Sequence, residues 1–171
     1  TCHLVNHKGV ALLAEIAREI KSSIIHFSTD YVYDVKEPRA ILETDSVGPK
    51  SEYAKSKLNG DMVLIDSELP FVILRTSWVY GNWGNNFVKT MMDLGKKRSN
   101  LKIIDDQFGA PTNTLTLALT VHRILSMADG NIKDFSGVYN ICDQGETTWF
   151  GFACKIFEMA TEMGLDLSVK E

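Results

Sequence analysis

The sequence predicts an α/β fold with a Rossmann-like, doubly wound parallel sheet, incomplete because its first strands are missing, and part of a smaller substrate-binding domain. Helical and strand-like segments alternate along the 171 residues. The strand-like segments are apolar on both faces, which is typical of a parallel sheet covered by helices on both sides. Polar residues directly follow two of these segments, and ligands of such folds bind beyond the carboxyl ends of the strands.

Helical periodicity predicts five helices. Apolar residues recur at helical spacing from Val5 to Ile20. A second helix is expected from about Ser51 to Ser67, because serine is a favoured helix N-cap. The other three helices are expected over residues 86–97, 115–127 and 148–163.

Short apolar runs predict four strands, and turn-forming residues predict the loops between them. The strands are expected over residues 23–27, 71–75, 101–104 and 137–142. The loops are expected over residues 30–50, which contain Pro38 and Pro49, and over residues 81–85 and 105–113.

The composition indicates a packed globular protein with 44% hydrophobic and 23% charged residues. A net charge of −4 gives no electrostatic reason to expect nucleic acid or an anionic membrane as partner. No apolar run reaches the length of a membrane-spanning helix. Three cysteines without a Cys-x-x-Cys pair favour reduced thiols in a cytoplasmic protein. His26 lies in an apolar run and is expected in the core rather than as a metal ligand.

Tyr53 and Lys57 lie four residues apart in the second predicted helix, and this spacing places them on one face. The pKa of tyrosine is near 10. A neighbouring ammonium group favours the phenolate and so lowers that pKa. The pair is therefore a plausible proton donor to a carbonyl group. The spacing alone is weak evidence, because five tyrosines give about a one-in-three chance of one Tyr-x-x-x-Lys.

The surroundings of this pair strengthen the hypothesis. Ser28 and Thr29 follow the first predicted strand, while Thr76 and Ser77 follow the second. The helix with Tyr53 connects these strands, so all these side chains are expected to meet at one crevice. The Gly-x-Gly-x-x-Gly turn of dinucleotide-binding folds does not occur.

Together with its Tyr53–Lys57 pair, the sequence resembles the extended short-chain dehydrogenase/reductase superfamily and, more closely, the dTDP-4-dehydrorhamnose reductase family. Seven segments in the family's order carry the resemblance and cover nearly the whole chain: Val5-Asn6, Ser28 to Tyr33, Glu43 to Asp45, Tyr53 to Leu58, Arg75 to Tyr80, Gly84 to Phe87, and Asp106 to Thr112.

The resemblance implies hydride transfer from NADPH or NADH to the C4 keto group of dTDP-4-dehydro-L-rhamnose, giving dTDP-L-rhamnose for polysaccharide synthesis. Tyr53 would protonate the developing alkoxide. Lys57 would lower the pKa of Tyr53 and hold the nicotinamide ribose. Thr29 would hydrogen-bond the substrate carbonyl or Tyr53. Asn6 would support a bound water near Lys57, or would only cap a helix.

The resemblance also implies further binding residues. The cofactor-binding set is Asn6, Ser28, Tyr53, Lys57, Thr76 and Ser77. The substrate-binding set is Thr29, Tyr31, Trp78, Asn86, Gln107 and Pro111. Trp78 is alternatively a core residue, and Asn86 alternatively caps the helix that follows it. Residues 1–80 and 114–145 would form the C-terminal part of an NAD(P)-binding domain, and residues 81–113 and 146–171 the substrate-binding portion.

The sequence departs from the family in several places. The glycine-rich segment is absent, so we expect an internal fragment that is inactive alone and exposes an apolar sheet edge. Some relatives bind magnesium through acidic residues after the Pro-Thr loop. Residues 113–116 are not acidic, and we expect no metal. Ala54 replaces a glycine, and Asp61 stands where glutamate is common.

Three alternatives remain open at this point: a nucleotide-sugar 4,6-dehydratase, a 4-epimerase, and a non-catalytic regulatory subunit of the same fold. A dehydratase would have an Asp-Glu pair after the threonine, whereas Tyr31 follows Asp30 here. The segments Arg75 to Trp78 and Gln107 to Thr112 favour the reductase. The sequence does not distinguish NADPH from NADH and leaves the oligomeric state open, a homodimer included.

Overall fold

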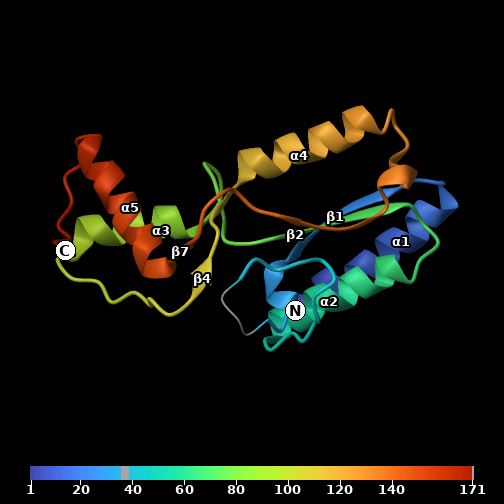
Figure 1. Cartoon of the computed structure of the whole chain (residues 1–171), viewed down its shortest axis with the longest axis horizontal. Coiled ribbons are helices and arrows are strands. Elements are labelled where there is room, and N and C mark those ends of the chain that lie inside the picture. Colours follow the sequence, from blue (N-terminus) through green and yellow to red (C-terminus); the bar gives the residue numbers. More distant parts are fainter. Residues whose placement is uncertain (36–38, 171) are drawn as a thin grey trace. The chain divides into compact units, whose positions relative to one another are not determined.

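The chain forms two compact units in a computed structural model that describes residues 1–35 and 39–170 (Figure 1). The first unit comprises Thr1–Ser77 and Leu117–Ile141, and the second comprises Trp78–Thr116 and Cys142–Glu171. The domain boundaries expected from the sequence lie a few residues away, and the binding roles assigned to the two parts stay predictions. Pro38, in the first expected loop, lies outside the described residues.

A three-stranded parallel sheet forms the centre of the first unit. Its strands are β1 (Ile24–Thr29), β2 (Phe71–Thr76) and β6 (Gly137–Ile141), in the order β1-β2-β6. Ser28 pairs with Arg75 in this sheet, and Thr29 pairs with Thr76. The parallel sheet is confirmed, and the carboxyl ends of β1 and β2 lie side by side.

Helices cover both faces of this sheet. On one face, α1 (Gly9–Glu19) and α2 (Glu52–Ile65) pack against Ile73. On the other face, α4 (Thr114–Met127) and the 3₁₀-helix η3 (Ile132–Phe135) cover β2. Figure 1 shows α4 on the side of the strands opposite α1 and α2.

The strand β2 contributes to both layers because successive side chains of a strand point to opposite faces. Ile73 packs with Val10 and Leu64, whereas Val72 and Leu74 pack in the cluster under α4. A strand that is apolar at consecutive positions therefore serves two cores, and the doubly wound arrangement is confirmed.

The segments before α2 bring polar side chains to the same end of the first unit. A π-helix, η1 (Leu4–Lys8), runs directly into α1, and a 3₁₀-helix, η2 (Asp30–Val32), follows β1. Ser51 caps α2, its side chain accepting a hydrogen bond from the Ala54 amide at 3.1 Å. The predicted cap is thus confirmed.

The second unit is built on two helices, α3 (Phe87–Lys97) and α5 (Trp149–Glu162). Met91, Ala153 and Ile156 are the buried centre of their contact. The remaining strands each have two residues: β3 (Val79–Tyr80) pairs with β5 (Thr112–Asn113) in parallel, and β4 (Phe108–Gly109) pairs with β7 (Thr147–Thr148) antiparallel.

The strand expected over residues 101–104 is wrong. This stretch has no strand partner, and the Ile104 carbonyl accepts a hydrogen bond from the Phe150 amide at 3.0 Å at the start of α5. Ile103 packs against the α3–α5 core instead. The segment is apolar because it covers two helices and not because it joins a sheet. The loop expected over residues 105–113 contains β4 and β5.

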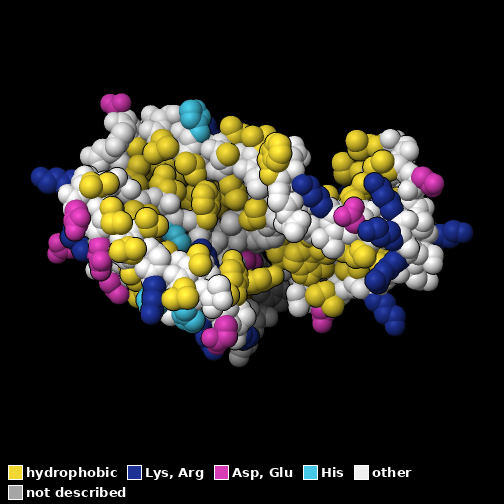
Figure 2. All heavy atoms as spheres, turned by 180° about the vertical axis from the view of Figure 1, so that it is seen from behind, with side chains coloured by type: hydrophobic (Ala, Val, Ile, Leu, Met, Phe, Trp, Pro, Cys, Tyr) yellow, Lys and Arg dark blue, Asp and Glu magenta, His cyan; other side chains and the backbone are white. Residues whose placement is uncertain are grey.

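The surface of the described chain has several apolar residues, as Figure 2 shows. Leu12 and Leu13 of α1 are exposed, as is Phe27 of β1, which is an edge strand of its sheet. An exposed apolar edge was expected. None of the described helices has the length and apolar character needed to cross a membrane. The three cysteines are exposed, and no disulfide joins them in the described part of the chain.

Candidate active site

One face of α2 carries a phenol, an ammonium group and a carboxylate at successive helical turns. These belong to Tyr53, Lys57 and Asp61, each four residues after the last. Tyr53 is 44% exposed, whereas Asp61 is 0% exposed. This face of α2 is therefore exposed to solvent at Tyr53 and fully buried at Asp61.

The exit of β1 lies beside this face. The Lys57 ammonium donates a hydrogen bond to the Phe27 carbonyl. The Thr29 hydroxyl donates to Asp30 Oδ1 at 3.2 Å and accepts from the Tyr31 amide at 3.3 Å. Thr29 also acts on the neighbouring phenol of Tyr53, where it lowers the pKa against the larger effect of burial. Thr29, Tyr53 and Lys57 are therefore neighbours, and the expected grouping of these three residues occurs.

The expected effect of Lys57 on Tyr53 is wrong for this structure. The pKa of Tyr53 lies above its usual value, chiefly because the phenol is partly buried and further because of the negative charge of Asp30. Lys57 binds the Phe27 carbonyl, and burial lowers its own pKa. The four-residue spacing correctly predicted that Tyr53 and Lys57 share a face of the helix. It could not predict that the Lys57 ammonium binds the Phe27 carbonyl.

Asp30 is a titratable group that the sequence reasoning missed. Burial raises its pKa to about 6, although hydrogen bonds from Thr29 and from the Asp30 and Tyr31 amides act in the opposite direction. Its position directly after Thr29, at a strand exit, was the available signal. The group changes charge near neutral pH beside the phenol of Tyr53.

Asn6 is held against α2 and does not cap a helix. It lies inside η1, and its Nδ2 donates to Ser56 Oγ at 3.0 Å. Ser56 Oγ in turn donates to the Tyr53 carbonyl at 2.7 Å. The cap interpretation of Asn6 is therefore wrong. A π-helical turn is a frequent feature of functional sites.

The other predicted cofactor-binding residues lie at the strand exits. Ser28 is buried and uses its hydroxyl to bind Asp61. Thr76 is buried at the end of β2, and its Oγ1 has no hydrogen-bond partner among the described residues. Ser77 follows it and is buried as well.

A buried polar network lies behind these exits. Arg75 Nε donates to Asp61 Oδ2 at 3.0 Å, and its guanidinium lies 4.8 Å from the centre of the Tyr33 ring. The Tyr33 hydroxyl donates to Asn140 Oδ1 at 2.8 Å. Burial raises the pKa of Asp61. His26 has its pKa lowered to about 4, mainly by burial, as expected for a core histidine.

The predicted substrate-binding residues are divided between the two units. Thr29 and the exposed Tyr31 belong to the first unit. Trp78, Asn86, Gln107 and Pro111 belong to the second. Gln107 is exposed and Pro111 is partly buried.

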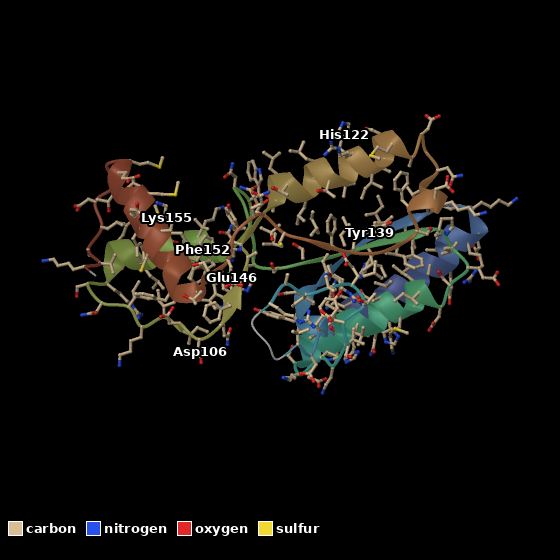
Figure 3. All side chains as sticks on the ribbon, viewed as in Figure 1. Asp106, His122, Tyr139, Glu146, Phe152 and Lys155 are labelled. Atoms are coloured by element: carbon tan, nitrogen blue, oxygen red, sulfur yellow. The ribbon has the colours of Figure 1, made fainter. Side chains whose placement is uncertain are left out.

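Trp78 is part of an aromatic group in the second unit. Its ring stacks on Trp149 with centroids 3.7 Å apart and planes inclined at 14°. Trp78 has a left-handed backbone, with φ of 46°. The centroid of the Phe87 ring lies 4.6 Å from that of Trp149 and 5.5 Å from that of Phe152. Figure 3 labels Phe152 on α5. The sequence reasoning missed Trp149, whose position at the start of a helix gave no signal.

Asn86 caps α3, as one of its two interpretations predicted. Its Oδ1 accepts from the Lys89 amide at 3.2 Å, and its Nδ2 donates to the Gly81 carbonyl at 2.8 Å. A role in binding the nucleotide stays a prediction.

No group of three or more His, Cys, Asp or Glu side chains in the described ranges is arranged to hold a metal ion. A cofactor is a different matter. The Lys57 ammonium binds the Phe27 carbonyl of β1, and the buried Thr76 hydroxyl at the end of β2 has no hydrogen-bond partner among the described residues.

A family model described as the RmlD substrate binding domain matches residues 1–169. The chain belongs to that family.

Several curated RmlD relatives carry the name dTDP-4-dehydrorhamnose reductase. The protein of that name from Escherichia coli strain K12 is 40% identical over 169 residues, which are 98% of this chain and 56% of the relative. The spore coat polysaccharide biosynthesis protein SpsK of Bacillus subtilis is 35% identical, again over 98% of this chain and 56% of the relative. The chain thus spans about half the length of the relatives it matches.

Solved structures of RmlD relatives agree with the fold. A dTDP-4-dehydrorhamnose reductase from Clostridium acetobutylicum has a TM-score of 0.86 at 36% identity, covering 98% of this chain and 56% of that one. The Bacillus anthracis protein of the same name, solved in complex with NADP, has a TM-score of 0.85 at 32% identity, covering 96% of this chain and 56% of that one.

Proposed function

We propose that this chain is part of an NAD(P)-dependent reductase that converts dTDP-4-dehydro-L-rhamnose into dTDP-L-rhamnose. The observation that carries this proposal is the Tyr53–Lys57 face of α2 beside the Thr29 hydroxyl. Membership of the RmlD family supports the choice of reaction. The names of the relatives support the choice of sugar nucleotide.

The reduction adds a hydride to C4 and a proton to the oxygen of the same carbonyl group. A bound NADPH or NADH supplies the hydride. Tyr53 donates the proton from its phenol, and Thr29 holds the substrate carbonyl or the phenol by a hydrogen bond. The phenol of Tyr53, whose pKa lies above its usual value, is protonated at neutral pH and so carries the proton that the alkoxide takes up.

The first unit has the groups that suit a bound nicotinamide cofactor. Lys57 would hold the ribose hydroxyls, and Asn6 would support a water beside it. Thr76 has a buried hydroxyl that lacks a partner in the described part of the chain, and a polar atom of the cofactor would satisfy it. Ser28 and Ser77 complete the set, Ser28 through its backbone because its hydroxyl binds Asp61.

Thr29 and Tyr31 are the proposed substrate contacts in the first unit, and four further proposed contacts belong to the second. Trp78 offers an apolar ring face of the kind that packs against a sugar. Asn86, Gln107 and Pro111 are the other substrate contacts proposed for the second unit. In this assignment residues of the first unit perform the chemistry, while residues of the second select the substrate.

The test is NADPH oxidation by the complete protein with enzymatically generated dTDP-4-dehydro-L-rhamnose. Tyr53→Phe is expected to lower the rate about a hundredfold or more, the usual scale for losing an acid–base group. Tyr139→Phe is the matched control, because Tyr139 lies on β6 and donates its hydroxyl to the Phe135 carbonyl (Figure 3). It should retain full activity.

No turnover by a folded, cofactor-bound wild-type protein would reject this reaction in favour of another nucleotide sugar or a regulatory role. Equal rates for Tyr53→Phe and wild type would reject Tyr53 as the proton donor.

A further inference from the structure

The proposed reaction does not use Asp61, although it is a carboxylate in the core of the first unit. Its side chain is 0% exposed. Oδ2 accepts two hydrogen bonds, from Ser28 Oγ at 2.9 Å and from Arg75 Nε at 3.0 Å. A buried carboxylate is costly unless it is paired, so its presence in α2 requires an explanation.

Its two partners occupy equivalent positions on neighbouring strands. Ser28 and Arg75 pair with each other in the sheet, and each directly precedes a residue of the proposed site, Thr29 and Thr76 respectively. Asp61 therefore joins the ends of β1 and β2 to α2, the helix that carries Tyr53. The strand exits and the phenol are fixed to one another through a single carboxylate.

Several charged or titratable groups of the described residues face Asp61. Arg75 comes from β2 and Lys57 from the preceding turn of α2. His26 comes from β1, where its Nε2 lies 3.6 Å from Asp61 Oδ1, and neither atom has a hydrogen-bond partner in the described ranges. His26 is neutral near pH 7, so the positively charged groups that act on Asp61 are those of Arg75 and Lys57.

We propose that Asp61 is a positioning residue, which holds the Thr29 and Thr76 strand exits against α2 and places a negative charge one helical turn after Lys57. The part of this inference that concerns turnover rests on the proposed reductase function. The part that concerns Lys57 does not.

The physical reason lies in the burial of Lys57. Burial lowers the pKa of Lys57, and the charge of Asp61 raises it. Without that charge the ammonium would lose its proton at a lower pH. A neutral lysine would no longer offer a full positive charge to a ribose. Asp61 thus acts on the site through Lys57 and through the two strands.

The first test measures the pKa of Lys57 directly, by following the NMR signals of its side chain in the complete protein as the pH is raised. Lys57→Arg identifies the signal by its loss. Asp61→Asn is expected to lower the pKa of Lys57 by about one unit or more, the scale for losing one neighbouring opposite charge. Ser28→Ala keeps the carboxylate and should leave this pKa nearly unchanged.

Leu64→Ala separates charge from stability. Leu64 is a fully buried, apolar residue of the same helix, so its side chain offers Asp61 neither a hydrogen bond nor a charge. This variant should unfold at a lower temperature without moving the Lys57 titration. If Leu64→Ala and Asp61→Asn shift the pKa equally, or if Asp61→Asn does not shift it, the proposal is overturned.

Turnover gives the second readout. The activity of Asp61→Asn should begin to fall at a lower pH than that of wild type, and Asp61→Glu should restore the wild-type position of that fall. If Asp61→Asn does not fold, Asp61→Glu takes its place in the NMR test. Because glutamate keeps the negative charge, the pKa of Lys57 should then be unchanged. A lowered pKa of Lys57 in this variant would contradict the proposal. A wild-type protein that does not reduce the sugar nucleotide would reject the reductase function alone, because the NMR result does not depend on it.

Discussion

Gly60 of α2 lies directly against the Asn6 carbonyl of η1. A Cβ atom on Gly60 would be 2.2 Å from that oxygen, far inside any contact distance. The absence of a side chain at Gly60 therefore allows the π-helical turn to approach α2. Asn6 reaches Ser56 from this position, and Ser56 binds the backbone of Tyr53. The close approach thus connects the packing of two helices to the proposed proton donor.

Gly60→Ala is expected to destabilise the protein by about 3 kcal/mol or more, at the upper end for overpacking, because the atom in the way belongs to the backbone. Urea unfolding monitored by circular dichroism measures this. Gly9→Ala is the matched control: it is also a helical position, but its nearest neighbour would lie at 3.4 Å. Alanine there should be neutral or stabilising by up to about 1 kcal/mol. Equal stabilities of the two variants would contradict the close approach.

Asp30 should make stability depend on pH in a defined direction. Its folded pKa of about 6 lies above the ordinary value of 3.8. Between these values the folded state keeps a proton that the unfolded state has lost, so stability falls as the pH rises from about 4 to about 6. Asp30→Asn removes the charge and keeps an oxygen for the Thr29 hydroxyl. We expect it to stabilise the protein above pH 6 by about 1–3 kcal/mol.

Chemical denaturation at a series of pH values measures this effect. Asp93→Asn makes the same substitution at an exposed position of α3 and controls for the loss of one carboxylate from the net charge. An Asp30→Asn protein that still loses stability between pH 4 and 6 as wild type does would assign that loss to another group.

Much of the fold could be predicted because local sequence and tertiary structure agree. Ser51, Asn86 and Thr148 each cap a helix that periodicity had already indicated. Val72, Ile73 and Leu74 are apolar in succession because β2 packs on both faces. The stretch over residues 101–104 shows the limit of this reasoning. Composition predicted a strand there, but a strand also needs a neighbour, and local sequence does not say whether one is available.

The candidate site, like the fold, could be predicted from the sequence only in part. Topology alone places Thr29 and Thr76 side by side, because parallel strands end at the same edge, and helical spacing places Tyr53 with Lys57. The direction in which a pKa shifts depends on burial and on where each charge points. Tyr53 is partly buried near Asp30, so its pKa rises although spacing predicted the opposite. Asp61 follows Lys57 by one turn, and only its contacts show that it joins two strands to the helix.

The position of Trp78 is expected to depend on Gly109. A Cβ atom on Gly109 would lie 2.6 Å from Cε2 of the Trp78 ring. The ring is also held by Trp149, and its backbone is in the left-handed region, which is unfavourable for a bulky residue. Gly109→Ala should therefore push the Trp78 ring off Trp149. The backbone strain would remain without the stacking that offsets it.

Near-ultraviolet circular dichroism measures this displacement, because two stacked indoles give a strong coupled signal. Gly109→Ala should weaken that signal, whereas Trp83→Phe should leave it intact, since Trp83 is 91% exposed. If Trp78 binds the sugar, as proposed, the KM for the sugar nucleotide should rise in Gly109→Ala while the KM for NADPH stays near the wild-type value. A weakened signal with both constants unchanged would assign Trp78 to the core of the second unit instead.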